Sequence, residues 1–179
     1  MHNQNRDKND FENMCLQEER TPERIVVDIL KEKNWHISFA ESCTGGLAVA
    51  RLVGVPDASW VLDVSVVTYA NEAKIEYLGV SPKTIKDNGV VSEEVAGEMA
   101  EGVAKNNHAE VGVGISGIAG PGGGTDKKPV GMVCFGFYVN GEVQTYTKYF
   151  GDMGRNNVRE ASVDFVYETL VEYLENIEI

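Results

Sequence analysis

The chain of 179 residues is 42% hydrophobic and 25% charged, which is typical of one soluble globular domain with or without a tail. This composition excludes a wholly disordered chain. No stretch approaches the ~18 uncharged apolar residues of a membrane span, and the N-terminus lacks the apolar core of a signal peptide. We therefore expect a cytoplasmic protein with no membrane partner.

The sequence carries 16 lysine and arginine residues against 28 aspartate and glutamate residues, a net charge of −12. Such a chain is a poor candidate for nucleic-acid binding, because neutralisation of phosphates drives that affinity. A small phosphorylated ligand remains compatible, since it needs only a local positive site. Cys15, Cys43 and Cys134 form no CxxC pair and the histidines form no HxxxH pair, so we expect neither a disulfide framework nor a metal site.

Residues 1–20 are polar and irregular, and we expect a mobile extension there, followed by one domain over 21–179. Thr21-Pro22-Glu23 is a typical helix start, and Asn140-Gly141 between two strand-like runs is a strong hairpin signal. Helices are expected over 22–33, 44–53, 71–78, 82–87, after Ser92 and from about 156. Strands are expected over 36–41, 60–68, 110–116, 130–139 and 142–150.

This alternation of strands and helices, with one hairpin, predicts an α/β domain of three layers around a mixed sheet. Ligands in such sheets tend to bind outside the carboxyl ends of the strands. Three motifs lie at strand ends, and a fourth precedes the last helix.

The first motif is the segment AESCTGG at 40–46, where a strand turns into a helix. A hydroxyl there meets free N–H groups, which suits Ser42 as an activated nucleophile and the N–H groups of Thr44, Gly45 and Gly46 as an oxyanion site. An equally weighted alternative is that Ser42 or Thr44 merely caps the helix. Cys43 is a rival nucleophile, although small buried cysteines are often part of a core.

The second motif, VTYANEAK at 67–74, contains two groups that accept protons when their pKa is depressed, Tyr69 and Lys74. Taken alone, Lys74 is more often an ordinary surface lysine. A serine nucleophile needs a base, however, and no histidine lies in an obvious motif. If Ser42 is the nucleophile, Lys74 or Tyr69 is therefore the favoured partner, as in Ser–Lys variants of the triad.

The third motif is the glycine-rich segment 116–129, which fits neither a P-loop nor a dinucleotide fingerprint. Its glycines allow close approach of the backbone to an anion; the alternative is a long turn that needs glycine for its backbone angles. The fourth motif, GDMGRNNVR at 151–159, places Arg155 and Arg159 at a helix start, which favours an anion such as phosphate. Ordinary ion pairing with neighbouring acids is the alternative there.

Together these segments resemble the C-terminal domain of the CinA family of competence/damage-inducible proteins, whose stand-alone members include the nicotinamide-nucleotide amidase PncC. The matching pieces are AESCTGG, VTYANEAK, GVVSEEVAGEMAEG, SGIAGPGGGTDKKPVG and GDMGRNNVR, which occur in family order and cover about residues 22–175. Departures from the family pattern lie at Ser65, Ala70, Asp126-Lys127 and Met153-Gly154.

The resemblance implies a three-layer α/β/α sandwich with a mixed sheet. It implies hydrolysis of the carboxamide of nicotinamide mononucleotide, a small phosphorylated nucleotide, to nicotinate mononucleotide and ammonia in pyridine-nucleotide recycling. It also implies no cofactor and a homo-oligomer. Ser42 then corresponds to the nucleophile, and Lys74 and Tyr69 to the base. Substrate contacts are expected at Thr44, Gly45, Gly46, Asn71, Ser116, Gly117, Gly120, Gly122, Gly123, Gly124, Thr125 and Arg155.

An alternative is a non-catalytic competence/damage-inducible module that binds a nucleotide or a protein partner without chemistry. Retention of Ser42, Tyr69 and Lys74 together with an anion site favours the enzyme, whereas the departures favour the module. Larger family members carry a further N-terminal domain resembling molybdopterin-binding proteins, so a pyrophosphatase activity linked to that domain is not expected of this chain.

Overall fold

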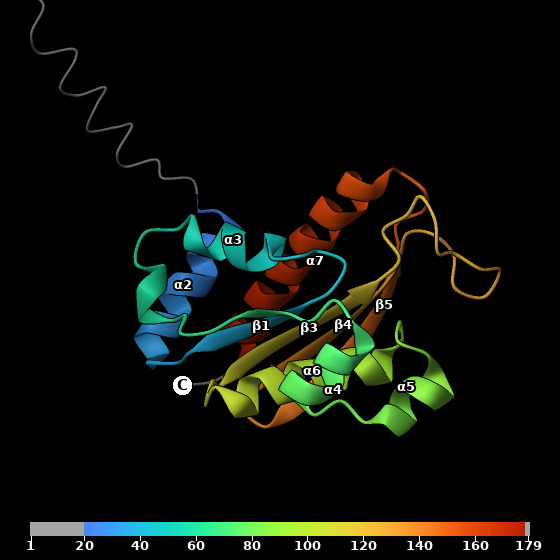
Figure 1. Cartoon of the computed structure of the whole chain (residues 1–179). Helices are drawn as coiled ribbons and strands as arrows, with labels where there is room; N and C mark the ends of the chain where they lie inside the picture. The colour runs from blue at the N-terminus through green and yellow to red at the C-terminus, as the bar shows by residue number, and fades with distance from the viewer. Residues whose placement is uncertain (1–19, 178–179) are drawn as a thin grey trace, which may run out of the picture.

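The computed structural model describes residues 20–177, and the expected extension lies almost wholly outside them (Figure 1). A five-stranded sheet runs in the order β2-β1-β3-β4-β5. The strands are β1 (Ile37–Glu41), β2 (Val66–Val67), β3 (Val111–Gly117), β4 (Met132–Val139) and β5 (Glu142–Tyr149). The helices are α2 (Pro22–Lys33), α3 (Leu47–Val53), η1 (Ala58–Trp60), α4 (Asn71–Leu78), α5 (Pro82–Asn88), α6 (Glu93–Asn106) and α7 (Arg155–Asn176).

The sheet is mixed, as the hairpin predicts. Strands β2, β1 and β3 are parallel, and β4 and β5 are antiparallel additions on one side. Helices α2, α3 and α7 cover one face, while α4, α5 and α6 lie on the other (Figure 1). The three-layer α/β/α architecture is therefore confirmed.

The side chains of β3 show why the two faces differ. Val111, Val113 and Ile115 belong to the large core under α2 and α7. The alternating positions Gly112 and Gly114 face α6 instead, because successive strand residues point to opposite faces.

Helix α6 lies so close to the sheet that backbone meets backbone. A Cβ atom added to Gly114 or to Gly136 of β4 would lie 2.2 Å from the carbonyl oxygen of Ala96. The same close approach recurs between α6 and α4, where a Cβ on Gly102 would lie 2.0 Å from the carbonyl oxygen of Leu78. The spacing between the sheet, α6 and α4 is thus determined by contacts between main-chain atoms.

Several sequence predictions are confirmed in detail. Helix α2 ends at Lys33, and the Thr21 hydroxyl accepts a hydrogen bond from the N–H of Arg24. Ser92 caps α6 by accepting from the N–H of Val95. In the β4–β5 hairpin, Asn140 and Gly141 have φ of 47° and 101°, the left-handed pair of a type I′ turn.

The strand predicted over 60–68 is wrong. Only Val66–Val67 is a strand, preceded by the η1 turn and an isolated bridge between Leu62 and Ile37. This segment lies at the sheet edge, where the Ser65 hydroxyl accepts from the N–H of Phe39 at 3.1 Å in place of a ladder carbonyl. Its β-branched residues suggested a strand over its whole length, yet Trp60 lies in the η1 turn and is 69% exposed.

Because α6 lies so close to the sheet, even a methyl group at a glycine of this contact should destabilise the fold. Gly136→Ala should lower the free energy of unfolding by about 1–3 kcal/mol, because a methyl group there collides with the backbone of α6. Gly122→Ala is the control, since nothing lies within 4 Å of a Cβ at that position. Denaturant titration of both variants checks this, and equal stabilities would contradict the backbone-contact account.

Candidate functional site

Ser42 and Lys74 meet at the carboxyl end of β1. The Nζ atom of Lys74 lies 3.2 Å from Oγ of Ser42, within hydrogen-bonding distance, and donates to the carbonyl oxygen of Thr68 at 2.7 Å. Ser42 follows β1 directly, and its own N–H donates to the carbonyl of Ile115 on the neighbouring strand. The fold thus brings together two side chains from motifs that lie 32 residues apart in the chain.

Lys74 is not a surface lysine. It is 1% exposed, on the face of α4 that lies against the sheet. Burial disfavours the charged ammonium and lowers the pKa of Lys74 below its ordinary value. A neutral amine can accept the proton of the Ser42 hydroxyl, which is what a general base for a serine nucleophile must do.

The carboxylate of Glu41 explains how the turn after β1 is held, and sequence reasoning missed it. Glu41 is buried, and its oxygens accept from the N–H groups of Gly46, Ala48 and Val49 at 2.9–3.1 Å. It therefore acts as the cap of α3. The signal was an acid at the end of a buried strand, five residues before the N-cap of a helix without a capping side chain.

This arrangement overturns the capping alternative for Ser42 and Thr44. The N-cap of α3 is Gly46, with φ of 94° and no side-chain cap, so the helix begins later than the predicted residue 44. The N–H of Gly46 is bound to Glu41 and does not serve an oxyanion site. Among residues 20–177, the N–H of Gly45 has no acceptor, and it remains a donor for such a site.

Cys43 is excluded as the nucleophile. Its thiol is buried, and desolvation raises its pKa to about 12. A reactive cysteine needs its thiolate. Cys43 is instead part of the hydrophobic core, as the sequence analysis allowed for a small buried cysteine.

Tyr69 lies at the site but not at Ser42. Its side chain is 63% exposed, and its hydroxyl accepts from a guanidinium N–H of Arg155 at 3.0 Å. Arg155 also donates to the carbonyl oxygen of Gly120 at 2.9 Å. Of the two predicted bases, only Lys74 is within hydrogen-bonding distance of the Ser42 hydroxyl.

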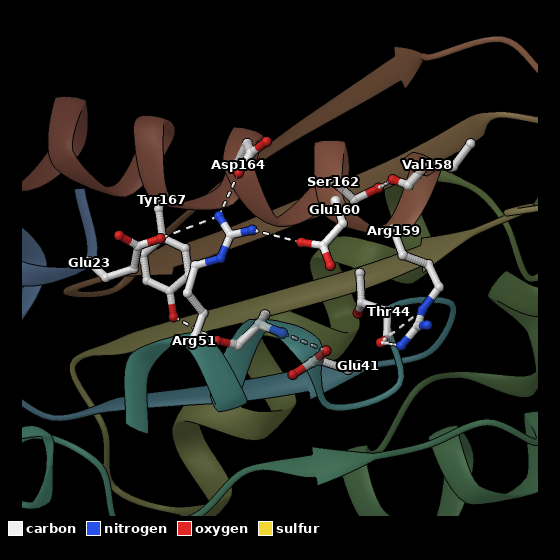
Figure 2. A network of polar contacts seen from close by, with 11 residues as sticks. Glu23, Glu41, Thr44, Arg51, Val158, Arg159, Glu160, Ser162, Asp164 and Tyr167 are labelled. Carbon is white, nitrogen blue, oxygen red and sulfur yellow. Dashed lines mark hydrogen bonds and ion pairs between the residues drawn. The ribbon is translucent and has the colours of Figure 1, made fainter. Parts of the chain in front are cut away.

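Arg155 lies at the site, directly after the Met153-Gly154 departure. Gly154 is the N-cap of α7, and Arg155 is its first residue. Arg159, one turn later, donates to the carbonyl oxygen of Thr44 at 2.7 Å (Figure 2). Within residues 20–177, neither arginine forms the ordinary ion pair with an acid that the alternative required; they bind carbonyl oxygens, the Tyr69 hydroxyl and Asn156 instead.

The glycine-rich loop divides into an inner and an outer part. Gly117 packs beside Cys43, and the carbonyl of Gly120 binds Arg155, so these two lie at the site. The Ser116 hydroxyl is already bound, donating to the carbonyl of Val90 at 2.8 Å. The outer residues, like Asn71 at the start of α4, are exposed and have no hydrogen bond to Ser42 or Lys74 within the described chain; they are Gly122, Gly123, Gly124 and Thr125.

Arg51 anchors α3 to the helices behind it. Its guanidinium contacts carboxylates of Glu23 on α2 and of Glu160 and Asp164 on α7 (Figure 2). Glu160 and Asp164 of α7 are therefore ion-pair partners of Arg51. The buried hydroxyl of Tyr167 adds a hydrogen bond to the carbonyl of Ala48 at 2.7 Å.

Residues 19–174 match the family model described as the CinA C-terminal domain. The chain belongs to the CinA family. It is 47% identical over 141 residues to a CinA-like protein of Dictyoglomus turgidum, covering 79% of this chain and 34% of that protein. It is 44% identical over 157 residues to a CinA-like protein of Kosmotoga olearia, covering 86% and 38%.

The chain thus spans little more than a third of the length of these curated CinA relatives. Among solved structures, the competence/damage inducible protein CihA from Agrobacterium tumefaciens superposes with a TM-score of 0.83. It shares 38% identity, over 87% of this chain and 94% of that one. These relatives confirm the resemblance to the CinA family and its fold.

Two negative findings apply to this CinA domain over residues 20–177. No helix there is both long and apolar enough to cross a membrane. No group of three or more histidine, cysteine, aspartate or glutamate side chains in that range is placed to hold a metal ion.

Glu41 offers a direct test of how the Ser42 turn is held. Glu41→Gln should lower the free energy of unfolding by about 1–3 kcal/mol, because an amide NH₂ group would face a buried N–H that now binds a carboxylate oxygen. Glu160→Gln, which weakens an exposed contact of Arg51, should change it by less than ~1 kcal/mol. Thermal or denaturant unfolding measures both, and a reversed order would refute the role of Glu41.

Proposed function

We propose that this CinA domain is an amidohydrolase that converts nicotinamide mononucleotide to nicotinate mononucleotide and ammonia. The observation that carries the proposal is the buried Lys74 amine 3.2 Å from the Ser42 hydroxyl. Burial that lowers the pKa of a lysine beside a hydroxyl is what a Ser–Lys hydrolase needs. The choice of substrate rests on the resemblance to nicotinamide-nucleotide amidases and on the nearby arginines.

In the first half of the reaction, the Ser42 oxygen attacks the carboxamide carbon and Lys74 accepts the hydroxyl proton. We expect the free N–H of Gly45 to donate a hydrogen bond to the oxyanion that forms. Lys74 then passes its proton to the amide nitrogen, the C–N bond breaks and ammonia leaves. The product is an ester between Ser42 and the nicotinoyl carbon.

In the second half, Lys74, neutral again, accepts a proton from a water molecule that attacks the ester. The tetrahedral intermediate collapses, the Ser42 oxygen regains the proton, and the nicotinate carboxylate is released. This sequence uses only the side chains and backbone named here and requires no metal or organic cofactor.

The phosphate of the substrate would lie near the start of α7. Arg155 is exposed and Arg159 partly so, and both project toward the turns that flank Ser42, as their contacts with Gly120 and Thr44 show. The positive end of the α7 dipole adds to their charge. In nicotinamide mononucleotide the pyridine ring and the ribose separate the carboxamide from the phosphate, so the carboxamide would lie at Ser42 while the phosphate faces these arginines.

Ammonia release from nicotinamide mononucleotide, measured with EDTA present, tests the proposal. Wild type should release ammonia, and Ser42→Ala should lower kcat by at least about a thousandfold, because no other nucleophile is activated there. Circular dichroism and melting of the variant control for folding. Release from neither protein would favour the non-catalytic module, and full activity of Ser42→Ala would refute the nucleophile.

The identity of the base is tested separately by pH. A base must be neutral, so kcat/KM should rise with pH through the pKa of Lys74, with a midpoint below the ordinary lysine value of ~10.4 because burial lowers that pKa. Lys74→Met should abolish activity, whereas Tyr69→Phe should keep the rising limb and chiefly raise KM, since its hydroxyl binds Arg155. Loss of the limb in Tyr69→Phe alone would identify Tyr69 as the base.

A further inference from the structure

The outer edge of β5 is a regular strand edge without protection. All eight residues of β5 pair one-to-one with β4, from Glu142 opposite Val139 to Tyr149 opposite Met132, with no bulge. No strand among residues 20–177 pairs with its other side. Proteins usually blunt such an edge with proline, bulges or repeated lysines, but β5 contains no proline and only Lys148.

The unpaired backbone groups of this edge belong to alternate residues. The N–H of Phe150 donates to the carbonyl of Gly131, which places the even-numbered residues of β5 in hydrogen-bonded pairs with β4. The outward N–H and C=O groups are therefore those of Val143, Thr145, Thr147 and Tyr149. Val143 and Tyr149 are also 40% and 65% exposed, which is high for large apolar side chains.

We infer that the β5 edge is the interface through which two copies of this chain form a symmetric dimer with one continuous sheet. A two-fold axis beside Thr145 aligns the strands antiparallel, with Thr145 opposite itself and Val143 opposite Thr147 of the partner copy. Residues with outward backbone groups then face one another, so their N–H and C=O groups can be satisfied across the axis.

The charges of β5 favour this register. With Thr145 on the axis, Glu142 of each copy lies opposite Lys148 of the other, which gives oppositely charged cross-strand pairs at both ends. Both side chains are exposed, and a hollow lined by Phe137, Gln144 and Tyr173 opens beside Glu142. Moving the axis by one residue in either direction removes the pairing of opposite charges.

The other edge of the sheet explains why the assembly should close at two copies. Strand β2 has two residues, too few to template a further strand. Within residues 20–177, pairing at β5 therefore uses the one long sheet edge and leaves no equivalent edge for growth, which is the isologous arrangement of a closed dimer.

A charge-reversal experiment tests the register. Wild type should be dimeric by sedimentation velocity or light scattering of the full chain. Glu142→Lys should weaken the dimer by about tenfold, because it places like charges opposite each other, and the swap Glu142→Lys/Lys148→Glu should restore it. Glu76→Lys, on exposed α4, makes the same change in net charge away from the edge and should leave the dimer intact.

A change in net charge alone cannot explain a weaker dimer in Glu142→Lys. That substitution makes the chain less negative, so two copies should repel each other less. A monomeric wild type would overturn the inference, as would a dimer that Glu142→Lys leaves unchanged or that the swap fails to restore. Melting curves of each variant confirm that the chain is folded.

A cysteine at the axis provides an independent measurement. Thr145→Cys in a Cys15→Ser background should form an intermolecular disulfide on mild oxidation, because the two β-carbons face each other. Tyr149→Cys, near the strand end, should form far less. Equal cross-linking of both variants would contradict the register. None of these positions takes part in the proposed chemistry, so amidase activity can fail while the dimer stands.

Discussion

A buried carboxylate fixes the position of everything around Ser42. Glu41 ends β1, and its oxygens receive N–H groups from the first turn of α3. Strand and helix are thereby joined on both sides of the Ser42 turn, without help from a hydroxyl cap. Because Glu41 accepts hydrogen bonds from these N–H groups, the Ser42 hydroxyl is not needed as a helix cap. It can therefore face Lys74 instead.

The site divides its electrostatic tasks between two regions. Around Lys74, burial disfavours positive charge and leaves an amine able to accept a proton. At the start of α7, Arg155 and Arg159 place two guanidinium groups at a partly exposed rim. Tyr69 links the regions, since its carbonyl lies near Lys74 while its hydroxyl binds Arg155. A ligand with a neutral amide at one end and an anion at the other matches this division.

Sequence reasoning succeeded where the determining signal was local. The Thr21 cap and the Asn140-Gly141 turn depend on a few adjacent residues, and the structure bears them out. The lack of a histidine in an obvious motif pointed to Lys74 or Tyr69 as the partner of Ser42, and the structure places Lys74 beside it. Sequence reasoning failed to predict the conformation of residues 60–68, because a run of β-branched residues does not reveal whether a segment lies at the centre or at the edge of a sheet.

Other features depend on contacts that no local pattern encodes. Arg155 and Tyr69 are 86 residues apart in the chain, and their meeting requires the whole sheet to be in place. The role of Glu41 required knowing that α3 begins only after a left-handed turn at Gly46. The sequence pattern could point to the two arginines as an anion site, but not to the carbonyl oxygens that hold them.

The close contacts at the glycines of the sheet and of α6 have a consequence for how precisely the reactive atoms are spaced. Ser42 follows a strand of the sheet, α6 touches that sheet through Gly112 and Gly114, and α4 touches α6 through Gly102. Lys74 is carried on α4. The chain of contacts from Ser42 to Lys74 therefore runs through main-chain atoms that meet at glycines. The gap between oxygen and nitrogen thus depends on these glycines being kept, and a side chain at any of them would push apart the layers that carry the two groups.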